Sequence, residues 1–75
     1  MLVHRMIKDL LEVFLKNGFT KKQLVRDVLD SPSTFRGDML QLAEDLEWLN
    51  TGLINELNAT NDSKLLHLIR IADET

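Results

Sequence analysis

The residue types that perform most enzymatic chemistry are few in this sequence, and their spacing does not bring them together. The two histidines, His4 and His67, lie near opposite ends of the chain, and there is no cysteine. A zinc site needs three or four histidine, cysteine or carboxylate ligands at close spacing. We therefore expect no metal site and no cofactor.

The carboxylates are densest at Glu44, Asp45 and Glu47. Acid–base catalysis by two carboxylates needs two different environments, one that retains a proton and one that releases it. On a helix, Glu44 and Glu47 share one solvated face, so the pattern gives both the same environment. A glycine-rich phosphate loop and a serine–histidine pairing are also absent from the sequence. We expect no catalytic residue, and we interpret these acids as a solubilising or partner-facing surface.

A different chemistry, DNA recognition, is suggested by the basic segment 16–36, which holds five basic and two acidic residues. Helices of about 20–30 and 33–45, joined at Ser31-Pro32, would resemble a helix-turn-helix, whose second helix presents its first residues to the major groove. The side chains placed to contact DNA are Lys21, Lys22, Arg26, Ser33, Thr34, Arg36 and Gln41.

Three features weaken this DNA-binding hypothesis. The turn has no glycine, and Asp38 follows Arg36 within the same helical turn. From Gly37 onward the sequence has eight acidic residues and only two basic ones, and this excess of negative charge would repel a phosphate backbone. DNA is therefore the second choice of partner.

The size of the chain favours association with another molecule. A domain of this size buries only about 60% of the surface that its unfolded form exposes, and disulfides, metals or partners usually supply the missing stability. The chain has 75 residues and no cysteine, and its 44% apolar content is ordinary for a folded domain. We expect one helical domain, 1–75, that self-associates or docks onto a partner.

The sequence contains no signal for export or for a membrane span. The longest apolar run is three residues, and Lys8, Asp9 and Glu12 interrupt the apolar pattern near the N-terminus. Absence of cysteine fits a reducing compartment. We expect a cytoplasmic protein without membrane contact. In size and helical content it is similar to small phage, plasmid and bacterial regulators, although no motif names a family.

Apolar periodicity predicts helices throughout. Apolar residues at spacings of three and four predict a first helix that ends at Asn17-Gly18. Thr20 and Gln23 have the spacing of a capping box and predict the start of a second helix. Asp62 or Ser63 is expected to cap the last helix.

The middle of the chain predicts one long helix. Its seam alternates steps of four and three residues through Phe35, Met39, Leu42, Leu46, Leu49 and Leu53. The helix could start near Ser33, or at Asp38 with Gln41 as a second capping box, and Asn50-Thr51-Gly52 could break or only weaken it. We favour a single helix over about 34–57, bent near Gly52. The fold class is then all-α, a small four-helix bundle or orthogonal helical array with one long central helix.

This helix carries more apolar surface than one neighbour can cover. We therefore expect a homodimer with Trp48 near its interface, and a non-enzymatic regulatory or adaptor protein that binds a protein partner, as antirepressors and inhibitors do. Its acidic rim suits a basic partner such as a DNA-binding regulator. The expected interface residues are Leu42, Leu46, Trp48, Leu49, Leu53, Glu44, Asp45 and Glu47.

Overall fold

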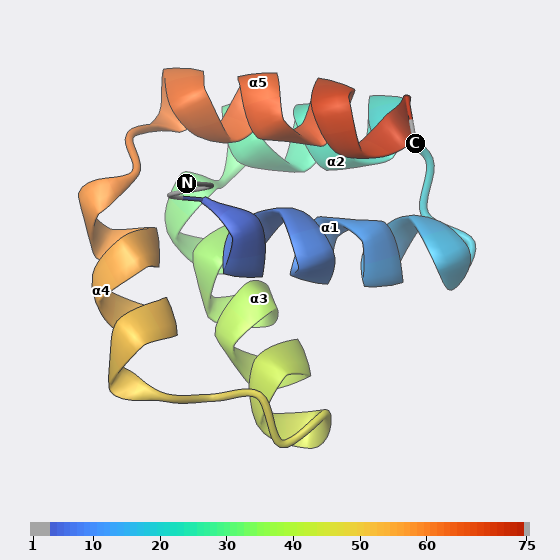
Figure 1. The fold of residues 1–75 in the computed structure, drawn as a ribbon. Coiled ribbons are helices and arrows are strands. Elements are labelled where there is room, and N and C mark those ends of the chain that lie inside the picture. The colour runs from blue at the N-terminus through green and yellow to red at the C-terminus, as the bar shows by residue number, and fades with distance from the viewer. Residues whose placement is uncertain (1–3, 75) are drawn as a thin grey trace.

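The computed structural model describes residues 4–74, and every regular element in that range is an α-helix (Figure 1). The helices are α1 (Arg5–Lys16), α2 (Lys21–Asp30), α3 (Pro32–Asp45), α4 (Thr51–Ala59) and α5 (Asp62–Asp73). The all-α prediction is confirmed, but the described part of the chain holds five helices rather than four.

The helices form two groups that cross each other. In Figure 1, α1, α2 and α5 lie side by side, while α3 and α4 run across them. Helix α2 runs antiparallel to α5, and Lys21 Nζ lies 4.0 Å from Asp73 Oδ2 where the start of α2 meets the end of α5. Helix α1 runs in the same direction as α5, so its first turn lies near the junction between α4 and α5.

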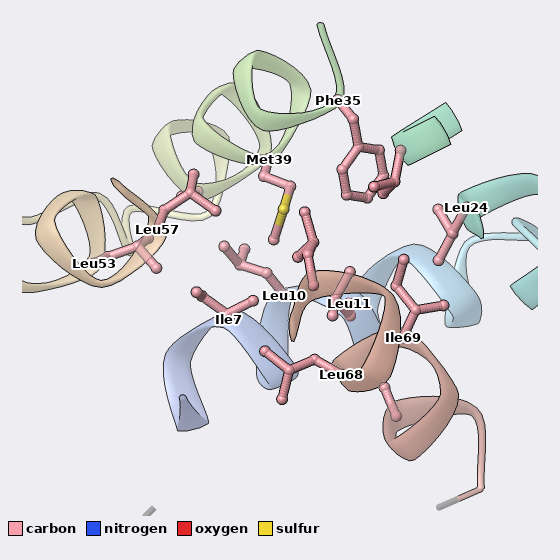
Figure 2. Close-up of a cluster of buried hydrophobic side chains, with 14 residues drawn as sticks. Ile7, Leu10, Leu11, Leu24, Phe35, Met39, Leu53, Leu57, Leu68 and Ile69 are labelled. Atoms are coloured by element: carbon pink, nitrogen blue, oxygen red, sulfur yellow. The ribbon is translucent and has the colours of Figure 1, made fainter. Parts of the chain in front are cut away.

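All five helices contribute apolar side chains to one core, which is centred on α1 (Figure 2). Ile7, Leu10 and Leu11 of α1 have no solvent exposure. Figure 2 shows Met39 of α3 and Leu53 of α4 pointing towards α1. The remaining core residues are Leu24, Val28, Phe35, Ala43, Leu57, Leu65, Leu68, Ile69 and Ala72.

The predicted end of the first helix and start of the second are confirmed. Gly18 has φ +97°, and the Phe19 amide donates to the Phe14 carbonyl at 3.2 Å, so α1 ends in a left-handed residue as the glycine predicts. The Phe14 and Phe19 rings meet edge to face with centroids 5.5 Å apart. The Thr20 hydroxyl accepts from the Gln23 amide at 3.1 Å, and the Gln23 side chain accepts from the Thr20 amide at 2.8 Å.

The prediction of one long central helix is wrong, because α3 ends at Asp45 and the next helix begins only at Thr51. Glu47 takes a left-handed conformation with φ +63°, a position that glycine usually fills. Its amide donates to the Glu44 carbonyl at 3.0 Å, and the Trp48 amide donates to the Ala43 carbonyl at 2.8 Å. These two bonds are those of a Schellman motif, which closes a helix.

Helix α4 has an N-cap residue of its own, Asn50, so the apolar seam over 34–57 crosses a break between two helices. The Asn50 side chain accepts from the Leu53 amide at 2.9 Å and donates to the Trp48 carbonyl at 2.9 Å. Gly52 lies in the first turn of α4 and not at a bend inside one helix.

Two further predicted boundaries need correction. Helix α3 begins at Pro32, one residue before the predicted start at Ser33, and it does not start at Asp38. Proline suits the first helical position because its fixed φ is helical and its missing N–H would have no helical partner there. The cap of α5 is Asn61, whose side chain accepts from the Lys64 amide at 2.8 Å, and neither Asp62 nor Ser63 is the cap.

Candidate functional site

A hollow of about 380 Å³ lies where the first half of α1 meets the loop between α3 and α4. Its volume is at the lower end of the range of about 300–1,000 Å³ that is usual for ligand pockets. We call it the tryptophan groove. Its lining residues are Met6, Asp9, Glu47, Trp48, Leu49, Asn50 and Leu53.

Large apolar side chains line much of the groove and remain accessible to solvent. Trp48 is 42% exposed, Leu49 38% and Met6 37%, whereas Leu53 is buried. Beside the groove, a Cβ at Gly52 would lie only 3.0 Å from Asn50 Oδ1, the oxygen that caps α4, whereas its 3.6 Å distance from Met6 Cε would be an ordinary contact. The groove therefore offers apolar surface contributed by α1, by the α3–α4 loop and by α4.

The loop that carries Trp48 and Leu49 is fixed at both ends. Before Trp48, the left-handed Glu47 and the Schellman bonds close α3, and after Leu49, the Asn50 side chain joins the Trp48 carbonyl to the first turn of α4. A left-handed residue with a Cβ costs about 1–2 kcal/mol, and such strain tends to occur at functional positions. Because the loop is already ordered, a ligand of the groove need not order it.

The α1 wall of the groove is held by α4. Helix α1 has no side-chain cap of its own, and the Ile7 amide instead donates to Glu56 Oε2 at 3.1 Å. The buried Thr60 hydroxyl donates to the Glu56 carbonyl at 2.7 Å and lies 3.4 Å from His4 Nδ1. These contacts fix the turn of α1 that carries Met6.

The charged residues that line the groove are both acidic. Asp9 comes from α1 and Glu47 from the α3–α4 loop, so the two carboxylates stand on separate walls. Asp9 Oδ2 lies 4.0 Å from Arg5 Nε, but both side chains are substantially exposed, and such pairs contribute little. The groove therefore favours a positively charged neighbour.

The structure brings together some of the interface residues expected from the sequence and separates others. Trp48, Leu49, Leu53 and Glu47 all line the groove. The others lie outside its lining: Leu42 and Leu46 pack half-buried against the core, while Glu44 and Asp45 are exposed on the last turn of α3.

Sequence reasoning missed Met6 and Asp9, which complete the groove from α1. Met6 belongs to the apolar stripe of the first helix, and its place in the chain gave no sign that it would lie at an exposed edge. The signal available was the width of that stripe, which exceeds what one packing face needs.

The residues expected to contact DNA do not form one available surface. The Arg36 guanidinium donates to the Leu57 carbonyl at 2.8 Å and to Asp62 Oδ1 at 2.7 Å, and its side chain is only 21% exposed. Arg36 therefore joins α3 to the α4–α5 junction. Gln41 donates to Asp45 Oδ1 at 3.1 Å.

The corner between α2 and α3 is acidic at the place where a recognition helix would approach phosphates. Three aspartates, Asp27, Asp30 and Asp38, line a hollow there beside Ser31 and Thr34. Lys21 faces Asp73, while Lys22, Arg26 and Ser33 are exposed. The arrangement puts negative charge beside the expected DNA contacts, which opposes binding to a polyanion.

A side-chain metal site and a membrane-spanning helix are both absent from residues 4–74. In this range, the histidine and carboxylate side chains form no group of three or more that could hold a metal ion. Within the same range, no helix combines the length and the apolar character that a bilayer crossing requires. Comparisons of the chain with protein-family models, curated proteins and solved structures found no match.

Proposed function

We propose that this chain is a small non-enzymatic protein-binding module, and that the tryptophan groove is its contact surface. The observation that carries the proposal is the pair of exposed side chains, Trp48 and Leu49, on a loop whose two ends are both fixed. Tryptophan is enriched among the residues that dominate binding energy at protein interfaces. Binding here would block or recruit a partner, in the manner of a small inhibitor, antirepressor or adaptor. The absence of cysteine supports action in the cytoplasm.

The chemistry of the groove supports a protein rather than a small molecule. The lining of the groove combines exposed apolar side chains with two acidic residues, and protein interfaces likewise combine apolar and polar groups. The partner is either a different polypeptide or a second copy of this chain. The DNA-binding alternative receives less support, because Arg36 is engaged within the fold and aspartates surround the α2–α3 corner.

Site-specific photocrosslinking in cells that express the protein tests this proposal. A benzoylphenylalanine at position 49 replaces a groove residue, and the same group at position 67 is a matched control, because His67 is also exposed and lies on α5, outside the groove. We expect position 49 to give discrete adducts with a polypeptide and position 67 to give fewer or different ones. Failure to form adducts at position 49, with a folded protein, would reject the groove as a protein-binding surface.

A further inference from the structure

The exposed face of α2 carries the chemistry that the tryptophan groove lacks. Lys22, Arg26 and Leu29 lie at steps of four and three residues, so they share one side of the helix over about 10 Å. All three are exposed, and Leu29, at 64%, is the most exposed large apolar side chain among the described residues. This face, which we call the α2 face, is an apolar anchor beside two positive charges.

We propose that the tryptophan groove of one copy of this protein binds the α2 face of a second copy. The proposal rests on the proposed function and names its partner. Leu29 would enter the groove against Trp48, while Lys22 and Arg26 would approach the carboxylates of Asp9 and Glu47. The contact is between two different surfaces of the same chain, so it is heterologous, and it yields a closed dimer only if both contacts can form at once.

Charge complementarity favours this pairing over a symmetrical contact of groove with groove. In a symmetrical contact, Asp9 and Glu47 of both copies would be brought together, and like charges across an interface are strongly disfavoured. In the heterologous contact, two carboxylates meet two bases. Lys22 and Arg26 of the basic segment 16–36 thereby have a role that does not involve DNA. Arg36 of the same segment is hydrogen-bonded within the fold.

The other basic face of the chain does not fit the groove as well. Lys64, His67 and Arg70 are exposed along α5, but α5 has no exposed large apolar residue. An occupant of the groove needs both an anchor and positive charge, and within residues 4–74 α2 is the helix that offers both on one face. The α5 pair Lys64 and Arg70 therefore supplies a matched control.

A charge exchange tests the contact by sedimentation equilibrium of the purified full chain, from micromolar to millimolar concentration at low salt. Each exposed ion pair contributes up to about fivefold, so losing both pairs in Lys22→Glu with Arg26→Glu should weaken self-association by up to about 25-fold. Asp9→Lys with Glu47→Lys should weaken it similarly. Mixing these two double variants should restore association, because each groove then meets an α2 face of opposite charge. Lys64→Glu with Arg70→Glu makes the same change in net charge and should leave association unchanged.

An apolar variant tests the contact without changing any charge, and a salt series tests the electrostatic part of the contact. Leu29→Ser should weaken association about tenfold without unfolding the protein, because Leu29 is exposed in the free chain. High salt should also weaken association. Circular dichroism confirms that each variant retains its helices.

Three outcomes would overturn the proposal. A monomer at every concentration excludes the contact, and association that Lys22→Glu with Arg26→Glu leaves intact shows a different interface. Equal effects of the α2 and α5 double variants would show that net charge alone is responsible. Photocrosslinking separates this failure from failure of the proposed function: adducts at position 49 with a foreign polypeptide retain the groove as a binding surface, whereas an adduct of twice the 8.7 kDa chain mass supports the second copy.

Discussion

Replacing Glu47 with glycine should stabilise the protein. Glu47 is the left-handed residue that closes α3, with φ +63°. The same position after α1 is occupied by Gly18, with φ +97°. The two helices thus end in the same motif, one with the residue that suits it and one without, and Glu47→Gly removes this difference.

The size of the effect follows from two opposing contributions. A left-handed conformation costs a residue with a Cβ about 1–2 kcal/mol, and glycine avoids this cost. Glycine also makes the unfolded chain more flexible, which reduces stability by about 0.5–1 kcal/mol. The net gain in the free energy of unfolding is therefore about 0.7 kcal/mol, which corresponds to an increase in Tm of roughly 3–6 °C for a domain of this size.

Thermal and urea denaturation, followed by circular dichroism, measures the change. Glu44→Gly is the matched control, because Glu44 is exposed and helical in the last turn of α3, where glycine should reduce stability by up to about 1 kcal/mol. Gly18→Ala is the reverse test and should reduce stability by about 1 kcal/mol. If Glu47→Gly destabilises as much as Glu44→Gly, the reasoning about the left-handed residue is refuted.

Three other changes have expected effects on the free energy of unfolding, each measurable by urea denaturation. Asn50→Ala should reduce it by about 1–2 kcal/mol, because it removes the cap of α4 and the bond to the Trp48 carbonyl, while Thr51→Ala should change it little. Arg36→Met should reduce it by about 1–2 kcal/mol, since the Leu57 carbonyl and Asp62 lose a charged donor, whereas Arg26→Met on the exposed face of α2 should stay within about 0.5 kcal/mol. Met39→Ala should reduce it by about 2–5 kcal/mol, because Met39 is fully buried, and Leu29→Ala at an exposed position should not.

Helix boundaries were predictable from the sequence where a local signal was complete. Gly18 ends α1, and the Thr20–Gln23 capping box begins α2, and both depend only on residues within one or two turns. The break between α3 and α4 was missed because its left-handed residue is a glutamate, which carries no turn signal, and because leucines continue at helical spacing through the loop. Apolar spacing alone cannot distinguish a continuous helix from two helices whose apolar faces both meet the core.

The groove was only partly predictable because its walls come from distant segments. Trp48 and Leu49 are exposed because of the geometry of their loop. The sequence indicated only that the helix predicted over about 34–57 had more apolar surface than one neighbour could cover. The contribution of Met6 depends on how α1 packs against α4, which is set by the whole core. Arg36 shows the same limit, since its role depends on the Leu57 carbonyl, 21 residues away.

The hydrogen bond between Glu56 and the Ile7 amide links the stability of α1 to the shape of the groove. Glu56 supplies both an acceptor for a free amide in the first turn of α1 and a negative charge near the helix N-terminus. Glu56→Gln retains the acceptor and should reduce the free energy of unfolding by about 0.5 kcal/mol, whereas Glu56→Ala removes both and should reduce it by about 1–2 kcal/mol.

Hydrogen exchange at the Ile7 amide distinguishes this contact from a general loss of stability. Exchange at Ile7 should increase in the order wild type, Glu56→Gln, Glu56→Ala, and by more than at Leu11 in the middle of α1, whose exchange follows the change in global stability alone. Because Met6 lies in the same turn as Ile7 and lines the groove, Glu56→Ala should also change the fluorescence of Trp48, the only tryptophan of the chain. Glu44→Ala, an exposed glutamate on α3, is the control for both measurements. Unchanged exchange at Ile7 in Glu56→Ala would show that α4 does not hold the α1 wall of the groove.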